Sequence, residues 1–318
     1  MRGDACRRSG PPCWRNLSRH LAFAGAVLLG PVASVAATSD AQKVRAPTRN
    51  ARVAPPTFAV GVQNVNLDVQ VTRGGRPIGG LTAADFVVTD NGVRQQVEIL
   101  SKEDTAVDAL LALDASSSVS GSRLAELQRA AHAFVAALWP TDSVTLVGFA
   151  TDLRIGARPG ASRAEVHAAI DRFRGSGATS LTDAVYAALL LSDPRRGRPL
   201  VLVFSDGRDR GSWLSRASVR DVIRSSDAVI DTVLVGDEDR SFLEEAARDT
   251  GGRSWAARTD RELEDAFLAA LDDFKSRYRL RYEPRDVRLA GWHALSVKLN
   301  GRKGEVRARR GYQVEGLR

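Results

Sequence analysis

Apolar segments alternate with helical patterns from Ala106 to Lys275, and this alternation limits the fold more than any other feature. Four apolar runs have the length and composition of buried strands: Asp108–Leu113, Ser143–Phe149, Leu200–Phe204 and Val229–Val235. Six other stretches have helical periodicity: Arg123–Leu138, Arg163–Phe173, Thr182–Leu191, Ala217–Arg224, Ser241–Asp249 and Arg261–Arg277. Strands that alternate with amphipathic helices form a parallel sheet covered by helices on both faces. The sequence therefore predicts an α/β fold with a doubly wound, mainly parallel sheet.

Hard oxygen donors follow two of the predicted strands. The first strand ends in Asp114-Ala115-Ser116-Ser117-Ser118, and the strand at Leu200–Phe204 leads to the carboxylate of Asp206. A loop at 177–181 carries Thr179. Ligands of open α/β sheets bind beyond the carboxyl ends of the strands, and carboxylates and hydroxyls suit Mg²⁺. The alternative is that Asp114 or a serine only caps the next helix.

Together these segments resemble the von Willebrand factor type A domain, which is also the integrin I domain. That family carries Asp-x-Ser-x-Ser, then a loop threonine, then an aspartate at a strand end. The matching residues are Asp114, Ser116, Ser118, Thr179 and Asp206. The resemblance implies that they bind Mg²⁺, with Mn²⁺ or Ca²⁺ as alternatives. It also implies an open metal position that accepts an Asp or Glu side chain of a protein partner.

Loops around these residues are expected to set specificity for the partner. They are Val119–Ser122, Thr151–Gly156, Gly175–Ser180 and Arg208–Trp213. Trp213, near Asp206, is the predicted aromatic contact. Its alternative is ordinary packing within the loop.

Period-two patterns flank the α/β segment. Alternating residues at Val65–Val71 and at Tyr278–Tyr282 and Leu295–Leu299 predict strands, with hairpin turns at Asp90-Asn91-Gly92 and Asn300-Gly301. We therefore expect an N-terminal β segment at 57–102, a von Willebrand factor A domain at 103–277 and a C-terminal β segment at 278–318. The two β segments are expected to form one small sandwich-like unit.

The flanking motifs resemble an exported bacterial family related to the von Willebrand factor A domain and abundant in Acidobacteria. The residues that carry this resemblance are Asp68-Val69-Gln70-Val71, Gly79–Phe86, Asp90-Asn91-Gly92 and Arg309-Arg310-Gly311-Tyr312.

The N-terminal part has the pattern of an export signal. Five arginines precede an apolar run at 21–36 that ends in small residues, so residues 1–37 are predicted to be a signal peptide. An uncleaved membrane anchor is the alternative, although the run is short for a membrane-spanning helix. Residues 38–56 are predicted to be a disordered linker. We expect an exported protein that is periplasmic, in the cell envelope or secreted. Cys6 and Cys13 lie in the leader, so the mature chain has no disulfide or thiol chemistry.

The net charge does not indicate a nucleic-acid partner. The chain has 46 Lys+Arg and 38 Asp+Glu, a net charge of +8. Without the leader, 41 basic and 37 acidic residues remain, a net charge of +4. The basic residues Arg302, Lys303, Arg307, Arg309 and Arg310 are interpreted as the solvated face of strands.

The sequence offers little support for an enzymatic activity. A serine nucleophile needs an aligned base, and only His132, His167 and His293 follow the leader. The sequence has no Gly-x-Ser-x-Gly or Walker motif. We therefore predict a metal-dependent protein-binding or adhesion module and no enzymatic activity. The alternatives are a structural scaffold of an envelope complex and, less favoured, a metal-dependent hydrolase.

Overall fold

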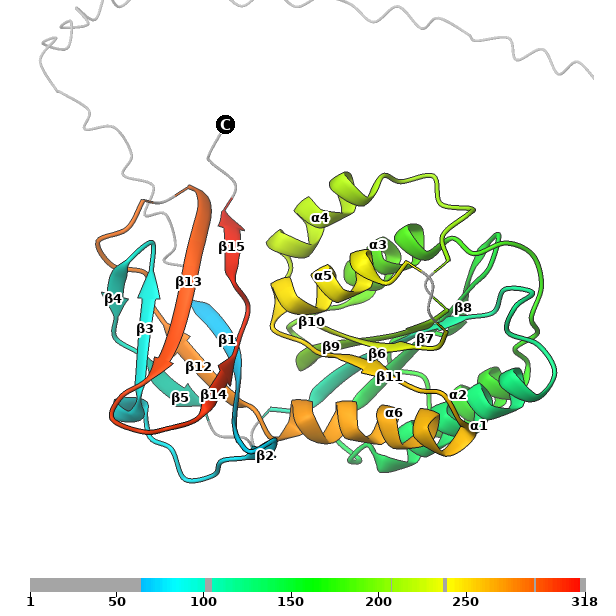
Figure 1. The fold of residues 1–318 in the computed structure, drawn as a ribbon, viewed down its shortest axis with the longest axis horizontal. Helices are drawn as coiled ribbons and strands as arrows, with labels where there is room; N and C mark the ends of the chain where they lie inside the picture. The colour runs from blue at the N-terminus through cyan, green and yellow to red at the C-terminus, as the bar shows by residue number, and fades with distance from the viewer. Residues whose placement is uncertain (1–63, 101–104, 207, 237–238, 289, 315–318) are drawn as a thin grey trace, which may run out of the picture. The chain divides into compact units, whose positions relative to one another are not determined.

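The computed structural model describes residues 64–100, 105–206, 208–236, 239–288 and 290–314, which all belong to one compact unit (Figure 1). The predicted signal peptide at 1–37, its alternative as a membrane anchor, and the predicted linker at 38–56 lie outside the described residues. Within the described part of the chain, no helix is long and apolar enough to cross a membrane.

A six-stranded sheet forms the centre of the α/β domain (Figure 1). Its strand order is β11-β10-β9-β6-β7-β8. The strands are β6 (Val107–Asp114), β7 (Ser143–Phe149), β8 (Leu153–Ala157), β9 (Arg198–Ser205), β10 (Val229–Leu234) and β11 (Ser254–Ala256). All neighbours are parallel except β7 and β8. Every residue of β6, β9 and β10 is buried, as expected for strands covered on both faces.

Helices cover the two faces of this sheet. One apolar cluster joins the sheet to α1 (Ser122–Ala137), α2 (Arg163–Asp171) and α6 (Asp260–Lys275). A second cluster joins the opposite face to α3 (Leu181–Leu191), α4 (Arg216–Ser225) and α5 (Ser241–Thr250). The six predicted helices are therefore present, with ends that differ by one or two residues.

The expectation of an α/β fold is confirmed, but the doubly wound layout fits only loosely. The chain returns from β7 to β8 through a short connection at 150–152, without a crossover helix, so β8 runs antiparallel. A tight connection can join only antiparallel neighbours, because parallel strands need a long crossover. The sequence pattern did not reveal β8, whose Leu153 and Ile155 are exposed, or the three-residue β11.

The N- and C-terminal strands pair with one another in two smaller sheets (Figure 1). The first has the order β14-β1-β12-β5 with β2 added to β1, and the second has the order β15-β13-β3-β4. Their N-terminal members are β1 (Val65–Arg73), β2 (Arg76–Pro77), β3 (Phe86–Asp90), β4 (Val93–Gln95) and β5 (Glu98–Leu100), with a short 3-10 helix η1 (Ala83–Asp85) before β3. Their C-terminal members are β12 (Tyr278–Tyr282), β13 (Gly291–Leu299), β14 (Glu305–Arg307) and β15 (Gly311–Val314).

One of the two predicted hairpin turns is present. Asn91 and Gly92 have φ values of 47° and 85°, and they join the antiparallel pair β3 and β4. The hairpin prediction for Asn300-Gly301 is wrong, because β13 pairs with β3 and β15 whereas β14 pairs with β1. The turn at Gly301 moves the chain from one small sheet to the other.

Buried ion pairs link the small sheets to the α/β domain. Asp273 of α6 accepts hydrogen bonds from Arg277 and from Arg307 of β14, at 2.8 Å and 2.6 Å. Arg309 donates to Asp227 at 2.6 Å. The prediction that Arg309 is solvated is therefore wrong, because its side chain is buried, whereas Arg307 is half-buried.

Candidate functional site

Asp114 is the last residue of β6, the strand with neighbours β9 and β7 on its two sides. Its side chain is fully buried. One carboxylate oxygen accepts a hydrogen bond from the Ser116 backbone N–H, and the other accepts one from the Ser205 hydroxyl, both at 2.9 Å. The sequence analysis missed Ser205, although it directly precedes Asp206.

The electrostatic environment of Asp114 favours its neutral form. Burial raises the pKa of the Asp114 carboxyl, the donors Ser116 and Ser205 oppose this rise, and the nearby Asp206 carboxylate raises it further. A cation beside these two carboxylates would reverse the balance, because its charge would offset both burial and repulsion. The arrangement therefore suits a bound cation.

The two serines of the motif contact one another. The hydroxyls of Ser116 and Ser118 lie 3.0 Å apart, and the Ser116 side chain is almost fully buried. A glycine at 121 with a φ of 60° precedes α1, so neither serine is needed as a side-chain cap of that helix. The helix-capping alternative is therefore wrong for this helix.

Thr179 lies in a loop that is hydrogen-bonded to the loop after β6 and to the loop after β9. The Ser117 N–H donates to the carbonyl of Gly177 at 3.1 Å, which connects this loop to the end of β6. The backbone N–H groups of Arg210 and Gly211 donate to the carbonyl of Thr179 at 3.0 Å and 2.9 Å. The Thr179 side chain is buried, and its hydroxyl has no hydrogen bond among the described residues.

Asp206 follows β9 directly and is buried. Its carboxylate accepts the Arg208 backbone N–H at 3.2 Å. The five predicted residues thus lie on three loops at one edge of the sheet. Asp114 accepts the backbone N–H of Ser116, the hydroxyls of Ser116 and Ser118 contact one another, Asp206 interacts electrostatically with Asp114, and Thr179 is connected through the backbone of its loop.

The donor set is compatible with a hard divalent cation, since it offers two carboxylates and three hydroxyls. Within the described residues, no group of three or more His, Cys, Asp or Glu side chains is arranged to hold a metal. The candidate set has only two such side chains, so a metal here would depend on the hydroxyls.

Two further aspartates brace the loop that carries Trp213. Asp183, in the first turn of α3, accepts the backbone N–H groups of Trp213 and Leu214, both at 2.9 Å. Asp209 accepts the hydroxyl of Thr182 at 2.5 Å. The Trp213 side chain is 94% exposed, so its packing within the loop is excluded. The sequence analysis missed both aspartates, although Asp183 follows Thr179 closely.

The histidines have other partners. The Nδ1 atoms of His132 and His167 lie 2.6 Å apart, and His132 Nε2 lies 2.9 Å from Asp171. Burial and the neighbouring His132 lower the pKa of His167. His293 contacts the buried Asp90 at 2.8 Å. In the described part of the chain, none of these rings is hydrogen-bonded to Ser116 or Ser118.

The fold and this edge define an α/β domain with carboxylates and hydroxyls gathered on the loops beyond its parallel strands. Residues 109–208 match the sequence model of the family described as von Willebrand factor type A domain. The chain therefore contains a von Willebrand factor type A domain, and the match spans less than half of its length. Such domains are commonly protein-interaction or adhesion modules and are usually not enzymes. No curated protein matches the chain significantly.

Solved structures with similar folds include proximal thread matrix protein 1 from the mussel byssus, with 18% identity and a TM-score of 0.50 over 59% of this chain and 50% of that chain. The von Willebrand factor type A protein from Catenulispora acidiphila has 15% identity and a TM-score of 0.47, over 80% of this chain and 73% of that chain. The conserved hypothetical protein BatB from Bacteroides thetaiotaomicron has 16% identity and a TM-score of 0.46, over 53% and 98%. At these identities the likeness concerns the fold alone.

Proposed function

We propose that this chain is an exported, metal-dependent protein-binding module that acts in adhesion or assembly. The observation that carries the proposal is the buried Asp114 carboxylate, which lies near Asp206 and next to the paired hydroxyls of Ser116 and Ser118. Two buried carboxylates that repel one another favour a bound cation, because its charge would offset both the burial and the repulsion.

Asp114, Ser116, Ser118, Thr179 and Asp206 would hold Mg²⁺, with Mn²⁺ or Ca²⁺ as alternatives. The bound ion would supply a Lewis-acidic centre for an Asp or Glu carboxylate of the partner protein. Because the hydroxyl ligands are neutral, they would leave part of the ion's positive charge uncompensated, and the partner's carboxylate would bind to that charge. Trp213, held outward by Asp183, would supply an aromatic contact beside it.

We also propose the finer assignments that the sequence motifs suggest. The chain would belong to the exported bacterial family abundant in Acidobacteria and would act in the periplasm, in the cell envelope or outside the cell. The two small sheets would form one sandwich-like unit, which their shared apolar cluster supports. Amino-terminal sequencing of the exported protein tests the first assignment, since it must begin near residue 38.

Calorimetric titration of Mg²⁺ into the full chain tests the metal site. We expect saturable binding in the natural protein and none in Asp114→Asn, because that change keeps the side chain's size and removes its charge. Ser116→Ala should weaken binding and provides a second variant if Asp114→Asn folds poorly. Asp152→Ala, which removes an exposed carboxylate of a neighbouring loop, is the matched control and should bind normally.

Absence of Mg²⁺ binding in the natural protein, with and without a soluble carboxylate such as acetate, would contradict the metal-dependent function and favour the scaffold. If the Asp114→Asn variant still binds the partner protein, that result would also contradict the metal-dependent function and favour the scaffold. Turnover of a substrate that disappears in Asp114→Asn or Asp206→Asn would instead favour the hydrolase.

A further inference from the structure

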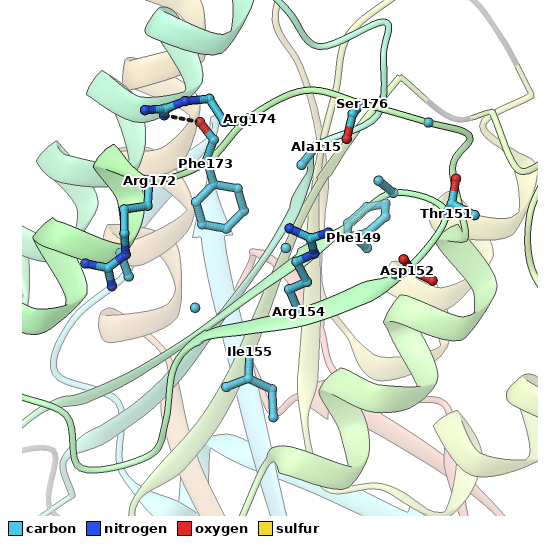
Figure 2. A pocket seen from close by; sticks show the side chains of 15 residues that line it. Ala115, Phe149, Thr151, Asp152, Arg154, Ile155, Arg172, Phe173, Arg174 and Ser176 are labelled. Carbon is cyan, nitrogen blue, oxygen red and sulfur yellow. Dashed lines mark hydrogen bonds between the residues drawn. The ribbon is translucent and has the colours of Figure 1, made fainter. Parts of the chain in front are cut away.

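A groove of about 500 Å³ opens beside the five candidate ligands (Figure 2). One wall is the edge strand β8 with Arg154 and Ile155, and the other is the end of α2 with the chain that follows it. Its inner end is formed by Ala115, Ser176 and Gly177. Ala115 stands between Asp114 and Ser116, and its carbonyl accepts the Ser176 N–H at 2.8 Å. The groove therefore lies close to the loops that carry the candidate ligands, and none of the five ligands is part of its lining.

Gly148 makes room for the floor of this groove. A Cβ atom on Gly148 of β7 would lie 2.3 Å from Cε1 of the Phe173 ring, whereas one on Gly156 of β8 would be in ordinary contact, 3.5 Å from Cε2 of the same ring. Phe173 can therefore lie against the sheet and remain half-buried. Its half-buried ring gives the groove an apolar surface, whereas the side chain of Ile155, which is 49% exposed, lies on the opposite face of β8 from Phe173.

Three arginines line the groove, and all are exposed: Arg154, Arg172 and Arg174 (Figure 2). Arg174 donates to the backbone carbonyls of Asp171 and Phe173, each at 2.7 Å. Among the described residues, none of the three guanidinium groups forms an ion pair with a carboxylate.

The charges in the lining are unbalanced, because Asp152 is its single carboxylate. Some exposed arginines elsewhere in the domain are paired, for example Arg195 with Asp193 and Arg216 with Asp239. Three arginines against one carboxylate make the lining net positive, although Figure 2 shows the guanidinium groups of Arg172 and Arg174 directed away from Arg154. A net positive surface attracts anionic groups, and guanidinium binds carboxylates with two parallel hydrogen bonds.

We propose that this groove binds a second acidic residue of the same partner segment whose first carboxylate reaches the metal. The inference rests on the proposed function and adds the partner's chemistry: an extended acidic peptide with an apolar residue between or beside its carboxylates. The exposed part of the Phe173 ring distinguishes such a peptide from a small inorganic anion, which would use only the arginines. Recognition then combines one carboxylate at the cation with a second one at the arginines that line the groove.

Fluorescence anisotropy with labelled hexaglutamate, in buffer containing Mg²⁺, tests the groove in the full chain. We expect Arg154→Gln/Arg172→Gln/Arg174→Gln to weaken binding at least about tenfold and to reduce its salt dependence. Arg158→Gln, an exposed arginine outside the groove, is the matched control and should bind as the natural protein does. All three arginines are exposed, so the variant should keep the natural melting temperature.

Variants of the two sites separate the two proposals. If the triple variant binds hexaglutamate normally, or the natural protein does not bind it, the groove proposal is overturned whatever the Mg²⁺ titration shows. If Asp114→Asn binds hexaglutamate normally while the triple variant does not, the groove stands and the metal-dependent function fails. Inorganic phosphate and an oligothymidylate serve as competitors, and their concentrations are compared with that of hexaglutamate per negative charge. If either competitor displaces hexaglutamate at a far lower concentration, the assignment to a peptide is overturned.

Discussion

At the scale of single residues, the candidate site depends on how one buried carboxylate is held. Asp114 has a donor on each oxygen, the Ser116 backbone and the Ser205 hydroxyl. These bonds fix the carboxylate at the end of β6, because a buried charged group without donors would be costly. Ser205 is fully buried, so its effect on a ligand would pass through Asp114.

We expect Ser205→Ala to weaken Mg²⁺ binding by about tenfold, the lower end of the effect of changing groups that orient metal ligands. The reason is that one Asp114 oxygen loses its donor and its orientation. Calorimetric titration measures the change, and Ser225→Ala, at an exposed position in α4, serves as the control. An unchanged dissociation constant for Ser205→Ala would show that Ser205 does not position Asp114 for a metal.

At the scale of elements, the loop after β9 is shaped by the first turn of α3. The Asp183 carboxylate binds two successive backbone N–H groups, at Trp213 and Leu214, and Ser212 and Asp209 bind the start of the same helix. These bonds satisfy the backbone of a segment without regular structure, which holds Trp213 outward. The exposed ring is thus a consequence of a bonded loop conformation.

We expect Asp183→Ala to increase hydrogen exchange of the Trp213 and Leu214 amides, because both lose their acceptor. Unsatisfied buried donors cost about 1–3 kcal/mol, which corresponds to a roughly tenfold or greater increase in exchange rate. Exchange of the amides in β9 should not change. Asp221→Ala, which removes an exposed carboxylate of α4, is the control. Equal protection of Trp213 and Leu214 in both variants would contradict this explanation of the loop.

At the scale of the whole molecule, the carboxylate of Asp273 connects helix α6 with strands β1 and β14. Asp273 accepts hydrogen bonds from Arg277, Arg307 and Gln70 of β1. Arg277 is fully buried and also donates to the carbonyl of Gly251 at 2.9 Å. Elements that are distant in the sequence are therefore connected through this one side chain.

The charge of Asp273 makes stability depend on pH. Burial raises the pKa of Asp273, but Arg277 and Arg307 more than offset this and hold it below the usual value of 3.8. Its contribution is therefore full above the unfolded-state pKa and is lost as the pH falls through the folded-state pKa. Burial raises the pKa of the neighbouring Asp231, whose contribution changes in the opposite direction.

We expect Asp273→Asn to lower the free energy of unfolding by about 3 kcal/mol near pH 7, since it leaves buried arginines without their carboxylate. The difference from the natural protein should shrink as the pH falls below the unfolded-state pKa and through the lower folded-state pKa of Asp273. Urea denaturation of both proteins at pH 7 and pH 3 measures this. The exposed neighbour Asp272 provides the control, Asp272→Asn. A difference that is constant with pH would contradict the role given to Asp273.

The paired terminal strands lead to a prediction for truncation. Deletion of residues 279–318 removes partners of β1, β3 and β5. Residues 65–100 should then become sensitive to limited proteolysis, because isolated short strands are marginally stable. A control that lacks only residues 315–318 should stay resistant. Equal resistance of 65–100 in the long deletion would contradict the sandwich-like unit.

The sequence by itself determined the elements whose pattern is local. Apolar runs and helical periodicity predicted the α/β domain and its helices, because burial on both faces of a strand or on one face of a helix leaves a direct record in residue order. The motif ending β6 and the aspartate after β9 also indicated which edge of the sheet carries the candidate ligands, since parallel strands end at the same edge.

Only the tertiary structure decided the features that depend on distant partners. β14 ends at Arg307 and β15 begins at Gly311, yet the structure places the two strands in different sheets, and Arg309 between them contacts Asp227. The edge strand β8 left no clear pattern, because its outer residues face solvent. The support of Asp114 by Ser205 and the arginine-lined groove likewise join segments far apart in the chain. Such contacts depend on how packed elements meet in space, and residue order records each element without recording its neighbours.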